Sequence, residues 1–290
     1  MHYIKLNSMK MKIIGLTLYA TIGASCVLAQ TNNVPVALPP KYHEIEVNGI
    51  WGFQDTPMQP NGKWHIHDPT RTQPPVVTPG TFSQKATPPS DAIVLFDGTD
   101  LSQWVDRKGN PAPWVIKDGA AITSQTDIFT KRKFGDIQLH LEFREPLPAT
   151  GEGQDRGNSG IFFMGVYEIQ VLDCFDNKTY PDGATGAIYA HHPPLANACR
   201  PPGEWQTYDI MFTTPHFGEH GEVIFPAYAT VILNGVVVQN HQAFRGTTTH
   251  CAVGEYSMRE PTGPLGLQYH LNSVAFRNIW VRAIPTANEP

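Results

Sequence analysis

The chain has 290 residues, of which 16% are charged, and its formal net charge is −5 at pH 7. This low and nearly balanced charge argues against a nucleic-acid partner, which would favour a strongly basic surface. The 26 prolines, the 25 glycines and the 10% of aromatic residues are typical of many short strands joined by turns.

The chain begins with a pattern typical of an export signal. Three lysines precede an apolar run over 13–24, and Val27–Ala29 has the small residues that a signal peptidase recognises. We therefore predict a signal peptide over 1–29 and an exported protein, periplasmic or extracellular. The apolar run is too short for a permanent transmembrane anchor. Cys26 leaves lipid attachment open, although Gly23 stands where lipoprotein signals usually have a large aliphatic residue.

Residues 30–90 are rich in proline and contain three Pro-Pro pairs. This composition predicts an extended and mostly irregular N-terminal arm. The arm also contains aromatic residues such as Trp51 and Trp64, which are unfavourable to expose to water. We therefore expect residues 41–85 to be ordered and to pack on the following domain through these aromatics.

From about residue 91 the sequence changes to apolar and polar residues in alternation, which is typical of half-buried antiparallel strands. Asn234 and Gly235 lie between two β-branched runs and form a strong hairpin signal. Because no long helical period occurs after the signal peptide, the pattern predicts an all-β fold with two antiparallel sheets packed as a sandwich or jelly roll. The residues expected in its core are Ile137, Leu139, Leu141, Ile169, Val171, Leu265 and Leu267.

The segment 167–173 carries the clearest candidate for chemistry. Strand alternation directs Glu168 and Gln170 away from the apolar face. Asp173 would join them only with a β-bulge near Leu172, a feature often found beside active sites. Two carboxylates with a polar group between them are typical of glycoside chemistry. An ordinary solvent-facing sheet surface is the alternative.

A second predicted strand, residues 264–271, supplies another polar face. Gln268 and His270 share a side with Gly266, which would leave room for a ligand. Histidine is a common proton carrier, so His270 could take that role, although a merely exposed histidine fits equally well. We expect one concave polar face, with Arg156 and Asn158 at its edge, formed by Glu168, Gln170, Asp173, Gln268 and His270.

The sequence leaves a divalent metal open. His191 and His192 are adjacent, and successive side chains of an extended chain diverge, so only one of them could join a metal site with Asp173 or His270. After the signal peptide the cysteines lie at positions 174, 199 and 251, and none belongs to a C-x-x-C pair. A bridge between Cys174 and Cys199 is open in an oxidising compartment.

Several motifs together resemble one known family. They include Leu95–Thr99, Gly157–Gly160, Tyr167–Asp173, Thr185–Tyr189, Gly263–Leu265 and Phe276–Trp280. With these motifs, residues 91–285 resemble the bacterial 3-keto-disaccharide hydrolase family, whose members have a concanavalin A-like sandwich. The resemblance implies an enzyme that cleaves the glycosidic bond of 3-keto-glycosides, made by a separate sugar 3-oxidoreductase.

The resemblance also implies a mechanism. A ketone at carbon 3 acidifies the hydrogen at carbon 2, so a base can form an enolate that expels the glycosidic oxygen from carbon 1, and water adds later. Direct hydrolytic displacement by paired carboxylates stays open. Glu168 or His270 is the expected base, with Asp173 as its orienter or a metal ligand. The expected sugar-binding residues are Arg156, Asn158, Gln170, Tyr189 and Gln268.

The same resemblance assigns a stabilising role to positive charge. Arg156 or a metal ion would hold the developing enolate oxygen, where fixed positive charge lowers the barrier. The main alternative function is a non-catalytic, lectin-like carbohydrate-binding module, because this fold also serves lectins and fold does not determine function. A structural role in an envelope assembly is the third alternative.

Overall fold

The structure is a computed structural model that describes residues 42–81 and 83–285. The predicted signal peptide and Cys26 lie outside the described residues. Within those ranges, no helix has both the length and the apolar character needed to cross a membrane.

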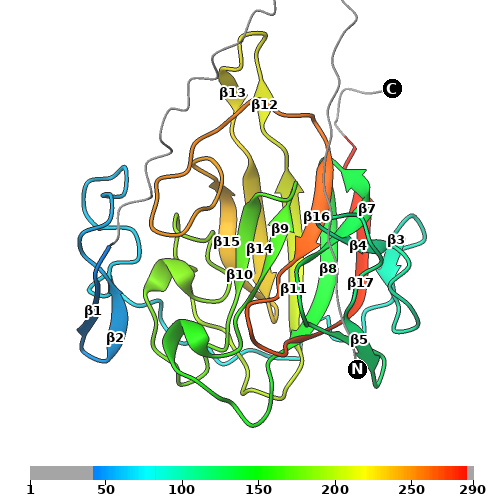
Figure 1. Cartoon of the computed structure of the whole chain (residues 1–290), viewed down its shortest axis with the longest axis horizontal. Helices are drawn as coiled ribbons and strands as arrows, with labels where there is room; N and C mark the ends of the chain where they lie inside the picture. The colour runs from blue at the N-terminus through cyan, green and yellow to red at the C-terminus, as the bar shows by residue number, and fades with distance from the viewer. Residues whose placement is uncertain (1–41, 82, 286–290) are drawn as a thin grey trace, which may run out of the picture. The chain divides into compact units, whose positions relative to one another are not determined.

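The larger of two main sheets has eight antiparallel strands in the order β15-β14-β11-β8-β17-β6-β5, with β3 paired to β17 (Figure 1). Its strands are β3 (Ile93–Phe96), β5 (Val115–Lys117), β6 (Ala120–Ile122), β8 (Ile137–Arg144), β11 (Gln206–Thr213), β14 (Tyr228–Leu233), β15 (Val236–Ala243) and β17 (Ala275–Ala283). The predicted hairpin joins β14 to β15. Asn234 and Gly235 have φ angles of 51° and 84°, the positive values that a tight two-residue turn needs.

The second sheet has five antiparallel strands in the order β10-β9-β16-β7-β4. They are β4 (Trp104–Asp106), β7 (Ile128–Phe134), β9 (Ser159–Phe163), β10 (Tyr167–Val171) and β16 (Gly263–Leu267). Short additional elements are β12 (His216–Phe217), β13 (Val223–Phe225) and the 3-10 turns η1 (Gly153–Asp155) and η2 (Pro181–Gly183).

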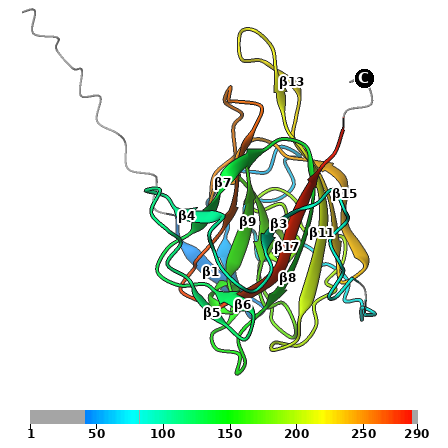
Figure 2. The same cartoon turned by 90° about the vertical axis from the view of Figure 1, so that its right-hand side faces the viewer.

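The apolar faces of the two sheets form one core, as the alternation predicted. Phe163 of β9 stacks on Phe212 of β11 with ring centroids 4.5 Å apart, and Figure 2 shows these strands in separate layers. The predicted two-sheet antiparallel sandwich is thereby confirmed. All seven expected core residues are at most 3% exposed: Ile137, Leu139, Leu141, Ile169, Val171, Leu265 and Leu267.

The described part of the arm is ordered and contacts the sandwich domain through polar groups and through aromatic rings, such as Phe53 against His250. It begins with a hairpin of β1 (Glu44–Val47) and β2 (Ile50–Phe53). Farther along, Ser83 Oγ donates a hydrogen bond to Asp209 at 2.7 Å, and the Lys85 N–H donates to Glu142 at 2.5 Å. The expected packing through Trp51 is wrong, since this side chain is 49% exposed. Alternation along β2 buries its neighbours and directs Trp51 outward.

Candidate functional site

A pocket of about 510 Å³ lies over the polar face of β9 and β10. Its lining residues are Glu44, Phe53, Gln154, Asn158, Phe162, Glu168, Gln170, Tyr180, Tyr189, Thr248, His250, Gln268 and His270. Glu44 and Phe53 belong to the β1–β2 hairpin, so the N-terminal arm contributes part of the wall.

Six residues singled out from the sequence line this pocket: Asn158, Glu168, Gln170, Tyr189, Gln268 and His270. Strand alternation places Glu168 and Gln170 on one face of β10, as expected. The strand predicted over 264–271 is shorter, because β16 ends at Leu267. Gln268 and His270 therefore reach the pocket from the segment that follows the strand.

Asp173 and Arg156 do not line the pocket, contrary to the expectation. The pairing of β9 with β10 runs without a bulge, and β10 ends at Val171. Beyond that end, Arg156 Nε donates a hydrogen bond to Asp173 Oδ2 at 2.7 Å. Arg156 Nη2 donates to the carbonyl of Phe175 at 2.8 Å. The side chains of Arg156 and Asp173 thus stabilise the loop after β10 and do not face the pocket.

Glu168 is a buried acid in the pocket wall. It is 5% exposed, and this burial raises the pKa of its carboxyl from 4.5 to about 8, with a smaller contribution from Asp127. Within residues 42–81 and 83–285, no hydrogen bond reaches the carboxylate. Such a carboxyl has a pKa near neutral pH and oxygens that a ligand can reach. It is therefore suited to exchange a proton with a bound ligand.

Burial of Glu168 predicts a loss of stability at alkaline pH. The folded chain keeps a proton on Glu168 that the unfolded chain releases above pH 4.5. The contribution of this group to stability is therefore complete below pH 4.5 and is lost as the pH rises through about 8. Above that pH, the free energy of unfolding of Glu168→Gln should therefore exceed that of the wild type by a few kcal/mol. In acid, the two free energies of unfolding should become equal. Thermal unfolding across pH measures this, and a difference that does not vary with pH would contradict it.

Gly160 on β9 makes room for the Glu168 carboxylate. A Cβ atom at this position would lie 2.2 Å from Glu168 Oε1, far inside contact distance. Gly266, which was expected to leave room for a ligand, instead makes room for the ring of Phe129, since a Cβ there would lie 2.7 Å from Phe129 Cε1. Close approach of side chains, rather than turn geometry, explains both glycines.

We expect Gly160→Ala to lower the activity of the pocket while leaving the fold in place. The new methyl group would push aside the end of the Glu168 side chain, which can rotate, rather than rigid backbone. Catalysis depends on side-chain placement to well under an ångström, so we expect at least a tenfold loss of kcat/KM. Circular dichroism and thermal unfolding provide the control. Unchanged kcat/KM would show that the position of this carboxylate does not matter.

Next to Glu168 lies a network of amide side chains. Gln170 Nε2 donates to Gln154 Oε1 at 3.1 Å, and Asn158 Nδ2 donates to the Gln154 carbonyl at 2.8 Å. Gln170 Oε1 is buried and has no donor among the described residues. Buried acceptors are normally satisfied, so a ligand hydroxyl would supply what this oxygen lacks.

The pocket residues that the sequence analysis did not single out include Gln154, Tyr180 and His250. Tyr189 Oη lies 3.0 Å from His250 Nδ1 and 3.4 Å from Tyr180 Oη. Burial raises the pKa of both tyrosines, so they remain neutral phenols. Gln154, Tyr180 and His250 lie in loops or short turns, where no strand periodicity indicates the direction of a side chain.

His191 and His192 do not form the metal site considered from the sequence. His191 Nδ1 accepts a hydrogen bond from the Arg245 N–H at 3.3 Å. Burial lowers the pKa of His191 to about 4 and that of His192 to about 3, so both rings are neutral. In the part of the chain that the structure describes, neither belongs to a cluster of candidate metal ligands. Cys174 and Cys199 are buried free thiols rather than a disulfide.

Comparisons with known proteins agree with this architecture. A solved structure from Parabacteroides distasonis ATCC 8503, described as a candidate glycosyl hydrolase, is 50% identical with a TM-score of 0.68, covering 73% of this chain and 93% of its own. Two others from the same strain and with the same description are 18% and 24% identical, with TM-scores of 0.49 and 0.48. Each covers 67% of this chain, and 94% and 99% of its own length. No curated protein matches the chain.

The family match covers nearly the whole sandwich. Residues 91–282 match the 3-keto-alpha-glucoside-1,2-lyase-like domain, which is well over half of the chain. This match and the 50% identical relative support a carbohydrate-active role. The resemblance noted in the sequence is thus confirmed, and the chain belongs to the 3-keto-disaccharide hydrolase family, that of the 3-keto-alpha-glucoside-1,2-lyase-like domains.

Proposed function

We propose that this protein cleaves the glycosidic bond of 3-keto-glycosides by elimination, with Glu168 as the base. The observation that carries the proposal is a buried carboxyl group in the pocket wall, without a hydrogen-bond partner among the described residues and with a pKa of about 8. An unpartnered carboxylate in a poorly hydrated site is a stronger base than one in water. The family match supports the substrate class.

In the proposed reaction the ketone at carbon 3 acidifies the hydrogen at carbon 2. The Glu168 carboxylate takes this hydrogen as a proton, and the electrons of the C–H bond form an enolate. The enolate then expels the glycosidic oxygen from carbon 1 with the electron pair of the broken bond, leaving a carbon 1–carbon 2 double bond. Later addition of water across this double bond completes a net hydrolysis. The ketone requires prior oxidation of the sugar by a separate 3-oxidoreductase.

The remaining pocket residues can be assigned from their positions. His270 is exposed at the pocket and can give a proton to the departing oxygen. Gln170 Oε1, which lacks a donor, would accept a hydrogen bond from a sugar hydroxyl. Arg156 cannot hold the enolate oxygen as first expected, because its guanidinium is bonded to Asp173 outside the pocket.

The test compares two substrates that differ only at carbon 3. A chromogenic 3-keto-glucoside should release its aglycone, whereas the parent glucoside with a hydroxyl at carbon 3 should not, because its carbon 2 hydrogen is not acidic. Substitution of that hydrogen by deuterium should slow the release. Equal release from both substrates would indicate direct displacement by carboxylates instead. Binding of the 3-keto-glucoside without release would favour the lectin-like alternative.

A further inference from the structure

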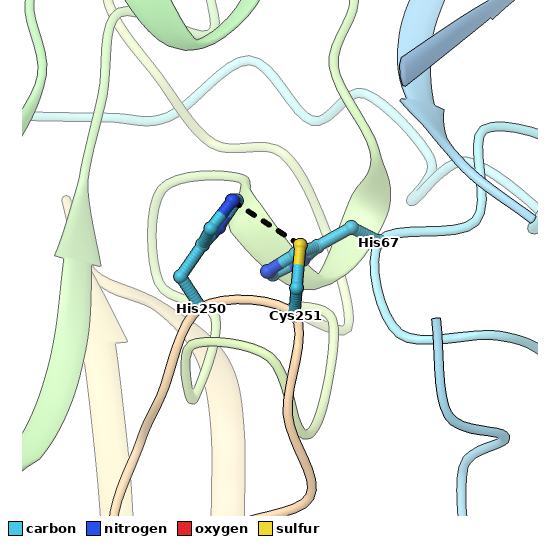
Figure 3. Close-up of side chains that lie close together, drawn as sticks. All are labelled: His67, His250 and Cys251. Carbon is cyan, nitrogen blue, oxygen red and sulfur yellow. Dashed lines mark hydrogen bonds between the residues drawn. The ribbon is translucent and has the colours of Figure 1, made fainter. Parts of the chain in front are cut away.

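Three metal-binding side chains converge beside the pocket, and none of them was singled out as a metal ligand from the sequence. His67, His250 and Cys251 each offer one ligand atom, and these atoms all lie within 4.8 Å of one another. Figure 3 shows the ring of His67 reaching between the other two side chains. His67 comes from the N-terminal arm, whereas His250 and Cys251 are neighbours in the loop between β15 and β16.

Contacts on the outer ring nitrogens hold both histidines with their Nε2 atoms toward the cluster. His67 Nδ1 lies 3.2 Å from Asp182 Oδ1, a contact that places the ring proton on Nδ1. His67 Nε2 then carries a lone pair, and it is buried with no partner among the described residues. His250 Nδ1 lies 3.0 Å from Tyr189 Oη, and its Nε2 lies 3.2 Å from Cys251 Sγ. Histidines that bind metals are usually oriented by such contacts on the opposite nitrogen.

The backbone at this cluster is unusual as well. His67 and Cys251 have φ angles of 61° and 55°, in the left-handed region that costs free energy for residues other than glycine. His67 is also completely buried, with its ring 4.2 Å from that of Tyr180. Two of the three side chains are thus held in position by conformations that the surrounding structure has to enforce.

We propose that His67, His250 and Cys251 bind a divalent transition metal such as Zn²⁺ or Co²⁺. Two imidazole nitrogens and a thiolate suit such borderline-soft ions, which take these ligands in tetrahedral sites, and do not suit Mg²⁺ or Ca²⁺, which prefer oxygen. On binding, the Cys251 thiol gives its proton to solvent and its sulfur bonds to the metal. Three protein ligands leave a fourth position for water or a small ligand.

The location makes the arm part of the site. His67 lies outside the matched family region 91–282, so the sandwich domain by itself has only two of the three ligands. His250 also lines the pocket, and the metal would therefore sit in the pocket wall. A role for the metal in polarising the sugar ketone rests on the proposed function, but metal binding itself does not.

The test uses the full chain after chelation and dialysis, titrated with Co²⁺. We expect one equivalent to bind and to produce the cobalt–thiolate charge-transfer absorption, with Zn²⁺ displacing it. Cys251→Ala should abolish that absorption, whereas Cys199→Ala, which removes another buried thiol, should retain it. His67→Ala should weaken Co²⁺ binding at least about tenfold.

Other outcomes separate this proposal from the proposed function. The absence of the charge-transfer absorption in the wild type, or its loss in Cys199→Ala and survival in Cys251→Ala, would overturn the metal site. A chain that binds Co²⁺ in this way but does not cleave 3-keto-glucosides would overturn the elimination reaction alone. Cleavage at the full rate by a wild-type chain that binds no Co²⁺ would overturn the metal site alone.

Discussion

Replacing Glu168 with glutamine should lower kcat/KM for a 3-keto-glucoside at least about a hundredfold while the chain stays folded. Glutamine keeps the size of the side chain but cannot accept the carbon 2 proton. The exposed Glu204 offers a matched control, because Glu204→Gln makes the same replacement at a side chain that does not line the pocket containing Glu168. If Glu168→Gln keeps the wild-type kcat/KM and melting temperature, Glu168 is not the base.

The wild-type pH profile gives an independent check of this role. A base must be deprotonated in the free enzyme, and the pKa of Glu168 is about 8, so kcat/KM should rise with pH and level off above about 8. Asp127 and Tyr189 face this group, and the negative charge of Asp127 contributes to the raised pKa. A profile that instead falls through pH 8 would make Glu168 the proton donor.

Replacing Asp182 with alanine should destabilise the chain by about 3–5 kcal/mol, the usual cost of breaking a buried ion pair from one side. Asp182 is completely buried and accepts hydrogen bonds from the His67 N–H at 3.1 Å and from Gln59 Nε2 at 3.1 Å. Arg71 Nη1 lies 3.6 Å from the same carboxylate. Without Asp182, the Arg71 charge and the His67 N–H are left without this partner.

This variant should also release the arm from the sandwich. Urea unfolding at neutral pH measures the stability loss, and limited proteolysis reports whether cleavage moves to the segment before residue 91. Alanine at the exposed Asp155 provides the control. Burial acts to raise the pKa of Asp182, but His67 and Arg71 outweigh it and lower the pKa. The stabilisation is therefore present at neutral pH and is lost in acid. An unchanged unfolding midpoint would show that this carboxylate does not hold the arm.

Local sequence pattern was sufficient for the sheets and for two residues of the pocket wall, Glu168 and Gln170. The pleat of a strand sends successive side chains to opposite faces, so alternation alone put Ile169 in the core and Glu168 and Gln170 on the pocket face. The turn at Asn234 and Gly235 was also predictable from the sequence, because its positive φ angles restrict which residues fit.

Other parts of the site depend on contacts between distant segments. Asp173 was misplaced because the strand ends at Val171, beyond which alternation no longer gives a direction and the pairing with Arg156 decides. His67 meets His250 and Cys251 only because Asp182 and the rings of Tyr180 and Tyr189 hold the arm against the loops. Periodicity is a local property of the chain, whereas the burial of Glu168 and the convergence of these loops arise only when the tertiary structure excludes water around them.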